Sequence, residues 1–311
     1  MSFSKINKNE NTKLNKKNNY FNEDFIKKLS RNISEKKENW PKISIVMPSF
    51  NQEKFIEQSI LSVLNQSYPN LQFIIIDGGS ADKTIKIIKK YNSYIQYWVS
   101  EKDLGQSDAL NKGFEKANGE IYGWLNADDL YLPNCFFLIA EMFKKNPNKL
   151  LIFGDWLNID HKNNILDLNH AFDFNLNHLK YEGFHLNSQS MLWRSSLHKQ
   201  FSGFDIKLNN TMDYQMILEF GIMAENKFLR IPKLIGVFRR HENQKTGKTI
   251  TPTILEEHML LAKKHNYPDK YKIVGKFKRH YYRYRRAYWY FKRGGINNLL
   301  KRLLSSIRVK L

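Results

Sequence analysis

Residues 43–77 read ISIVMPSFNQEKFIEQSILSVLNQSYPNLQFIIID, which is one complete strand–helix–strand pattern. The apolar run Ile43–Met47 has the length of a buried strand, and Pro48–Asn51 interrupts it. Apolar residues then recur at helical spacing from Ile56 to Leu64, before a second β-rich run that ends just ahead of Asp77. This stretch therefore predicts two buried strands that are joined by a helix.

The same alternation continues toward the C-terminus. The pattern predicts helices at 82–91 and 107–117, and strands at 94–99 and 120–125. Strands that alternate with helices of this length pair in parallel and form a doubly wound α/β sheet flanked by helices. Ligands of such sheets bind at the carboxyl ends of the strands. We therefore look for functional residues directly after each predicted strand.

Beyond residue 130 the pattern is less regular. It still predicts two helices and two strands, at 133–145, 150–153, 212–223 and 228–231. The polar stretch 155–185 gives no interpretable pairing. Residues 1–40 contain few apolar side chains, and we expect them to be disordered or at most marginally helical.

The charge of the chain is unevenly distributed. The 311 residues carry a net charge of +20, but residues 270–311 alone contain fourteen Lys and Arg and no acidic residue. Residues 41–269 are nearly neutral, with 26 basic and 25 acidic side chains. A nucleic-acid enzyme more often places its excess charge along a groove of the folded domain.

Cysteine content and hydropathy indicate the cellular compartment. Cys135 is the only cysteine, so an internal disulfide is impossible, and its apolar neighbours predict a core position. No apolar stretch is long enough to span a bilayer, and no secretory leader is recognisable. We expect a cytoplasmic protein.

Asp128 and Asp129 form the strongest chemical signal. They stand in Trp124-Leu125-Asn126-Ala127-Asp128-Asp129, which follows a predicted strand. Adjacent carboxylates are costly unless a cation lies beside them, and hard divalent cations such as Mg²⁺ or Mn²⁺ prefer oxygen ligands. The alternative is an Asp turn in which Asp129 caps a helix.

Two other strands are followed by candidate binding residues. Asp77-Gly78-Gly79-Ser80 permits a tight turn, and Asp77 could accept hydrogen bonds from a base or ribose, or could cap an ordinary turn. Pro48, Phe50 and Asn51 follow the first strand, where Phe50 could stack on a base or belong to the core.

Three further segments contain residues with two interpretations each. Ser107 and Asp108 open a helix, where they could cap it or contact a ligand. Asp213 begins the helix at 212–223 and could act as a general base, or could simply complement the helix dipole. His241 could be a ligand or an ordinary surface residue after a strand. It follows Arg239 and Arg240, which could hold a phosphate or form a solvated basic patch.

Read in order, these segments resemble glycosyltransferase family 2, a family of inverting transferases with the GT-A fold. The resemblance covers roughly residues 42–245, and the matching segments are ISIVMPSFNQEKFIEQSILSVLNQSYPN, IIIDGGSADKT, SEKDLGQSDALNKGFEKANGEIYGWLNADDLYLP, FSGFD and MDYQMILEF. It implies a mixed GT-A sheet with a donor-binding half at 41–130 and an acceptor-binding half at 131–250. A basic, helical C-terminal region at 251–311 completes the predicted organisation.

The resemblance also implies roles for individual residues. Donor binding would fall to Pro48, Phe50, Asn51, Asp77, Asp108 and Asp128. A divalent metal, Mn²⁺ or Mg²⁺, would be held by Asp128, Asp129 and His241. Asp213 matches the catalytic base, although Met212 replaces a frequent Glu, and Asn126 replaces a third Asp that many members have.

The implied reaction transfers a sugar from a nucleoside-diphosphate sugar to a glycan or lipid-linked acceptor hydroxyl, with inversion. By family analogy it would serve cell-surface polysaccharide or lipid-linked glycan synthesis. Two other classes stay open: a metal-dependent nucleotidyltransferase, and a non-catalytic nucleic-acid binder that uses the basic tails.

The basic tail makes a separate prediction. Aromatic and cationic residues are interleaved over 281–293, and an apolar stripe at helical spacing follows over 296–311. This pattern is typical of a helix that lies on an anionic membrane, here the inner face of the plasma membrane. The alternatives are packing on the catalytic domain or on a second subunit, and, with less support, nucleic-acid binding.

Overall fold

The computed structural model describes residues 39–308 apart from 185, 243, 246–250 and 269–272, and within the last helix it describes side chains as far as Lys292. The predictions for residues 1–38 and for the side chains of the stripe at 296–311 lie outside this described part. The strands are β1 (Ile43–Ser49), β2 (Leu71–Asp77), β3 (Tyr97–Ser100), β4 (Ile121–Trp124), β5 (Leu130–Tyr131), β6 (Leu151–Asp160), β7 (Ile165–Asn169), β8 (Met191–Arg194) and β9 (Phe228–Arg240).

Helices connect most of these strands. The α-helices are α3 (Ile56–Leu64), α4 (Thr84–Lys90), α5 (Gln106–Lys116), α6 (Cys135–Lys145), α7 (Leu176–Tyr181), α8 (Ser195–His198), α9 (Met212–Ala224), α10 (Pro252–Lys264) and α11 (Ile273–Arg308). Short 3₁₀ helices are η2 (Asn92–Tyr94), η3 (Ser188–Ser190) and η4 (Glu225–Lys227).

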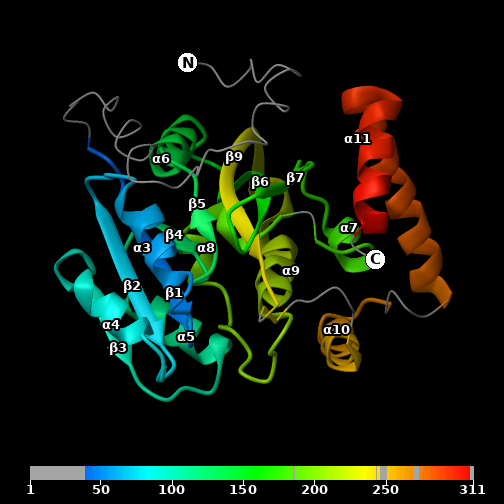
Figure 1. Cartoon of the computed structure of the whole chain (residues 1–311). Coiled ribbons are helices and arrows are strands. Elements are labelled where there is room, and N and C mark those ends of the chain that lie inside the picture. The colour runs from blue at the N-terminus through cyan, green and yellow to red at the C-terminus, as the bar shows by residue number, and fades with distance from the viewer. Residues whose placement is uncertain (1–38, 185, 243, 246–250, 269–272, 309–311) are drawn as a thin grey trace.

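In the described part of the chain, all nine strands belong to one mixed sheet. Eight of them follow the order β3-β2-β1-β4-β8-β6-β9-β5, and β7 pairs with β6. The four strands β3, β2, β1 and β4 are parallel, β8 is antiparallel to both of its neighbours, and β6 pairs in parallel with β9. This confirms the predicted mixed α/β sheet, which continues through both predicted halves of the domain (Figure 1).

Alternate side chains of the parallel strands enter two separate cores. Val46, Ile74 and Trp124 pack on one face with residues of α5 and α9. Ile45 and Ile75 pack on the other face with residues of α3 and α6. Because both faces are covered, the strands read as continuous apolar runs in the sequence. Cys135 is buried in the second core, as predicted.

The second half of the sheet differs most from the prediction. β6 and β9 continue well past 150–153 and 228–231, and the stretch 155–185 contains β7 and α7. The long strands pair along their length as far as Asp160 and Arg240, with irregular register beside Gly154. A Cβ on Gly154 would lie 2.4 Å from the Lys233 carbonyl oxygen. Polar residues interrupt the apolar runs of these strands, so the sequence pattern predicts only the first part of each strand.

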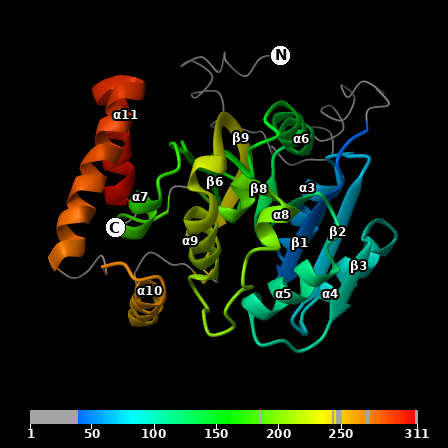
Figure 2. The ribbon, with the colours of Figure 1, turned by 180° about the vertical axis from the view of Figure 1, so that it is seen from behind.

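The C-terminal region forms two helices at one end of the molecule. α11 lies beside α7, at the opposite end of the sheet from β2 and β3, and both views show this arrangement (Figures 1 and 2). Within the described residues, no helix has the length and apolar character needed to cross a bilayer.

Candidate active site

The predicted site residues follow strands that end at one edge of the sheet. β1 pairs with β2 on one side and with β4 on the other, all in parallel. Asp77, the last residue of β2, is opposite Ser49, the last residue of β1. The loop that carries Asp128 leaves β4 at the same edge, where the Leu125 amide donates to the Val46 carbonyl at 3.1 Å. The motifs after three different strands are therefore brought to a common edge.

The two adjacent aspartates point in different directions. The Asp129 side chain is buried, and its two oxygens accept hydrogen bonds from the Arg239 amide (3.0 Å) and from Asn126 Nδ2 (3.2 Å). Burial, followed by the charge of Asp128, raises the pKa of Asp129 well above its usual range. Asp128 instead remains partly exposed, at 18% of its side-chain surface. Asp128 is therefore the carboxylate that is presented for chemistry.

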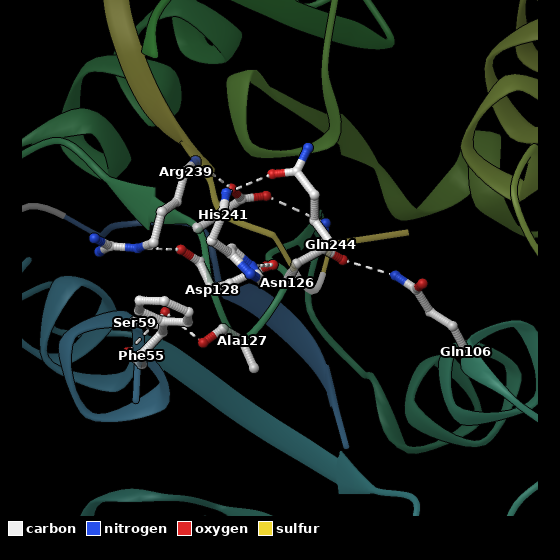
Figure 3. Close-up of polar contacts among 10 residues, drawn as sticks. Phe55, Ser59, Gln106, Asn126, Ala127, Asp128, Arg239, His241 and Gln244 are labelled. Carbon is white, nitrogen blue, oxygen red and sulfur yellow. Dashed lines mark hydrogen bonds and ion pairs between the residues drawn. The ribbon is translucent and has the colours of Figure 1, made fainter. Parts of the chain in front are cut away.

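His241 is the partner of Asp128. Its Nε2 lies 2.9 Å from Asp128 Oδ2, and its ring packs on Phe55 with the ring centroids 4.7 Å apart (Figure 3). The His241 amide donates to Gln244 Oε1 at 2.9 Å, which fixes the backbone just beyond β9. The structure thus brings together a carboxylate and an imidazole that are 113 residues apart in the sequence.

Arg239 supports this loop from below. It is 1% exposed, and its Nε donates to the Asp128 carbonyl at 2.9 Å. The same guanidinium donates to Gln58 Oε1 at 2.8 Å and to Asn163 Oδ1. It is therefore not part of a solvated patch, and its donors are directed at the protein. Arg240, with 36% of its side chain exposed, lies 3.7 Å from an Asp167 oxygen.

Replacing Arg239 with Met should lower the free energy of unfolding by about 3 kcal/mol, because buried acceptors around the Asp128 loop would lose their donors. Urea denaturation measures this change. The neighbouring Arg240→Ala variant is the control, and we expect it to stay within about 0.5 kcal/mol of the parent protein. Equal losses in the two variants would show that Arg239 has no special supporting role.

The start of α5 is tied to the aspartate loop. Gln106 Nε2 donates to Asn126 Oδ1 at 2.8 Å (Figure 3), and Trp124 Nε1 donates to the same oxygen at 2.8 Å. Asn126 is thus fully engaged in holding the loop. Ser107 does not cap α5 as considered above, because its hydroxyl donates to the Leu208 carbonyl at 2.9 Å.

Asp108 lies in the first turn of α5. One of its carboxylate oxygens accepts from the Leu104 amide at 3.1 Å and lies 3.3 Å from Lys112 Nζ. These contacts give Asp108 a local structural role. Its side chain is 19% exposed, so a contact with a donor remains a prediction.

Asp77 anchors its own turn. Its carboxylate is fully buried and accepts hydrogen bonds from the amides of Gly79 and Ser80 and from the hydroxyls of Ser80 and Ser100. The left-handed conformation of Gly79 (φ 82°) gives the turn its shape. Asp77 therefore stabilises the turn after β2, and its binding of a donor remains a prediction.

The loop after β1 is hydrogen-bonded to the same turn. The Asn51 amide donates to Ser80 Oγ at 2.7 Å, and Asn51 Oδ1 accepts from the Ala81 amide at 2.9 Å. Pro48 is buried within β1. Phe50 is 58% exposed, so it is not a core residue, and its ring is available for stacking at this edge.

Asp213 occupies the first turn of α9. Burial raises its pKa to about 6, although the Tyr214 amide donates to its carboxylate at 2.8 Å. The segment that precedes α9 is tied to α5 through Ser107 and Leu208, and Lys245 Nζ reaches the Asn209 carbonyl at 3.5 Å. Helix α5 and the segment that follows His241 therefore both contact the residues that precede α9.

Glu257 of α10 fixes the same segment from behind. This buried carboxylate accepts from the amides of Asn209 and Asn210 at 3.0 and 3.1 Å. It also accepts from Asn210 Nδ2 at 3.2 Å and from Thr211 Oγ1 at 2.8 Å. Four hydrogen bonds from three consecutive residues make Glu257 the clamp on the approach to Asp213.

Several of these residues were not found from the sequence. Phe55, Gln58, Gln106 and Glu257 look like ordinary helix residues, and only their distant partners give them a role. The sole sequence signal for Glu257 is an acidic residue within the otherwise apolar spacing of a helix.

Asp128 and His241 form a donor set that suits a divalent cation. Mg²⁺ and related ions bind through one or two protein ligands when phosphate oxygens of a substrate complete their coordination. Within the described residues, no group of three or more His, Cys, Asp or Glu side chains is placed to hold a metal. Asp128 and His241 are the residues of this site that could hold a divalent cation, and their binding of a metal is a prediction. A metal contact by Asp129 remains a prediction.

Sequence comparisons show the family of the chain. A sequence model of glycosyl transferase family 2 matches residues 44–201. An uncharacterized glycosyltransferase of Rickettsia typhi is 32% identical over 189 residues, which cover 58% of each chain. One of Haemophilus influenzae is 43% identical over 116 residues, or 36% of this chain and 44% of the relative. The match therefore spans roughly half of the length of these relatives.

Solved structures share the fold. TarS of S. aureus aligns over 72% of this chain and 39% of its own, with a TM-score of 0.57 and 19% identity. A shorter TarS structure, in complex with UDP-GlcNAc, aligns over 86% of this chain and 79% of its own, with a TM-score of 0.56 and 16% identity. At this identity the likeness shows the arrangement of the sheet and helices.

Proposed function

The chain belongs to glycosyl transferase family 2, and we propose that it is a glycosyltransferase that moves a sugar from a nucleoside-diphosphate sugar to an acceptor hydroxyl with inversion. The observation that carries the proposal is the Asp128–His241 pair, in which Asp128 stays partly exposed, at the sheet edge where parallel strands bind ligands. Family membership favours this activity over the nucleotidyltransferase and the non-catalytic nucleic-acid binder.

Asp128 and His241 would hold a divalent cation, Mn²⁺ or Mg²⁺, which neutralises negative charge on a diphosphate leaving group. Phe50 would stack on the base of the donor, at the same edge. The TarS complex supports testing a UDP-sugar first, because that fold neighbour was solved with UDP-GlcNAc.

Asp213 would act as the general base. In the transfer, the bond between the anomeric carbon and the diphosphate oxygen breaks as the acceptor oxygen attacks from the opposite face. The acceptor proton passes to the Asp213 carboxylate, and the nucleoside diphosphate leaves with the bonding pair. A pKa near 6 suits this role, because the carboxylate is ionised at neutral pH and still basic enough to accept the proton.

The acceptor is proposed from the relatives. Chondroitin synthase of Escherichia coli, a polysaccharide-forming enzyme by its name, is 25% identical over 191 residues, or 61% of this chain and 28% of the relative. We propose that the acceptor is a glycan or a lipid-linked glycan of a cell-surface polysaccharide. The enzyme would then work at the inner face of the plasma membrane.

A panel of sugar nucleotides tests the proposal. Each candidate is scored for a Mn²⁺-dependent thermal shift and for release of nucleoside diphosphate. We expect one nucleotide sugar to be hydrolysed slowly without acceptor, and the rate to fall on chelation. Release of pyrophosphate instead, or no thermal shift with any member of the panel, would contradict the proposed function.

Replacing Glu257 with Gln should lower kcat about tenfold while KM for the donor changes less than about twofold, because the segment leading to Asp213 would lose its clamp. The charge of Glu257 also raises the pKa of Asp213, so the acidic limb of the kcat–pH profile should move to lower pH. The exposed neighbour Glu256 provides the control, Glu256→Gln. An unchanged pH profile in the Glu257 variant would restrict Glu257 to a purely structural role.

A further inference from the structure

One side of α11 is fixed to the catalytic domain. Arg286 Nη1 lies 2.8 Å from an oxygen of the buried Glu182 carboxylate, and the Tyr282 ring stacks on Tyr181 with the centroids 6.0 Å apart. Further along, Tyr290 is 6% exposed, and its hydroxyl donates to the His170 carbonyl at 3.4 Å. These contacts set the orientation of the helix about its own axis.

The opposite side of α11 carries an exposed aromatic stripe. Its five members are 48–74% exposed and are Phe277, Tyr281, Tyr284, Tyr288 and Phe291. Their spacing of four, three, four and three residues places them on one face of a helix. At 100° per residue that face lies opposite Tyr282 and Arg286, which hold the helix to α7. Isolated exposed apolar residues are ordinary, but a continuous stripe indicates a binding surface.

Cations border the stripe on both sides. Lys276 and Arg283 project along one flank and Arg285 and Lys292 along the other, and all four are exposed. Residues 270–311 contain no acidic side chain that could neutralise them. The surface therefore combines rings that favour an interface between water and hydrocarbon with positive charge at its edges.

We propose that this outer face of α11 docks on an anionic lipid surface. The rings would enter the headgroup region, and the flanking cations would lie among negatively charged headgroups. The charge also argues against a second copy of the chain as the occupant, because two such helices would bring their cationic flanks together. The packing and membrane alternatives from the sequence thus apply to opposite faces of the same helix.

Vesicle sedimentation of the full chain tests this proposal. The protein should pellet with vesicles of phosphatidylcholine and phosphatidylglycerol but not with phosphatidylcholine alone, and added salt should release it. Y281S/Y284S/Y288S should lower the partition constant at least about tenfold. Replacing Lys276 or Arg285 with Gln should lower it up to about fivefold each.

Matched controls separate binding from folding. Tyr94→Ser removes a ring that is 62% exposed on η2, far from α11 in the sequence, and it should leave partitioning into vesicles unchanged. Tyr284→Ser removes a ring of similar exposure, 70%, from the stripe on α11, and it should lower partitioning. Circular dichroism and hydrolysis of the donor should be unchanged in the triple variant, because its residues face away from the domain. The membrane result is therefore independent of the proposed function.

Three results would overturn the proposal. The first is failure of the intact protein to pellet with anionic vesicles. The second is equal pelleting of the parent protein and the triple variant. The third is that the protein does not bind vesicles but forms a dimer, or a complex with single-stranded nucleic acid, and that the triple substitution abolishes this assembly.

Discussion

Asp128→Asn is expected to lower kcat for sugar transfer at least about a thousandfold, which corresponds to about 4 kcal/mol of transition-state stabilisation. The substitution keeps the size of the side chain but removes the negative charge beside His241 Nε2. We propose that this charge holds the cation that neutralises the leaving diphosphate. Its loss should therefore act on the reaction much more than on the fold.

Two measurements isolate the effect of Asp128. The thermal shift caused by Mn²⁺ alone should disappear in the variant, which is a readout independent of turnover. The matched control is Asp167→Asn, since Asp167 of β7 has a similar side-chain exposure of 21% and forms an ion pair with Arg240 of β9. We expect this control to keep full activity. A Mn²⁺ shift that survives in Asp128→Asn would place the cation elsewhere.

Asp213→Asn is expected to abolish transfer while donor affinity changes less than about twofold. The Asn side chain cannot accept the acceptor proton, but nothing about the donor-side edge of the sheet is altered. Titration calorimetry with the donor and a transfer assay measure the two quantities separately. Glu225→Gln, an exposed substitution at the far end of α9, is the control and should transfer at the parent rate.

The pH dependence follows from the same residue. The base works only when ionised, so kcat should be half-maximal near pH 6 and fall about tenfold per unit below it.

The raised pKa also means that folding opposes ionisation of Asp213, so its contribution to stability declines as pH rises from about 4 through 6. The Asn variant should therefore be no less stable than the parent at pH 8. A marked loss of donor binding or of stability would reassign Asp213 to a structural role.

Much of the fold could be predicted from the sequence because its determinants are local. The apolar runs of β1, β2 and β4 are buried on both faces, and the helices between them show regular apolar spacing. These features fix parallel strands, and parallel strands fix a common edge at which Asp77 and Asp128 lie. The spacing of the motifs along that edge was specific enough to identify the family.

The sequence was least informative where interacting residues are distant along the chain. β6 and β9 pair over a long stretch through their backbones but contain polar side chains, so neither strand shows its full length as an apolar run. The stabilising role of Glu257 follows from its hydrogen bonds to residues 209–211, which form only when α10 packs against that segment. α11 looks like one amphipathic helix, and only Glu182 and Tyr181 reveal which side is already occupied.

The sequence by itself determined the class of sheet, the edge that carries the chemistry, and the residue types gathered there, because all three follow from short-range patterns. Only the tertiary structure decided which of two adjacent carboxylates faces outward. Asp129 turns inward because the Arg239 amide, 110 residues away, donates to it, while Asp128 is left to meet His241. Neighbours in a turn have equal local preferences, so the choice between them depends on contacts that form only when the chain is folded.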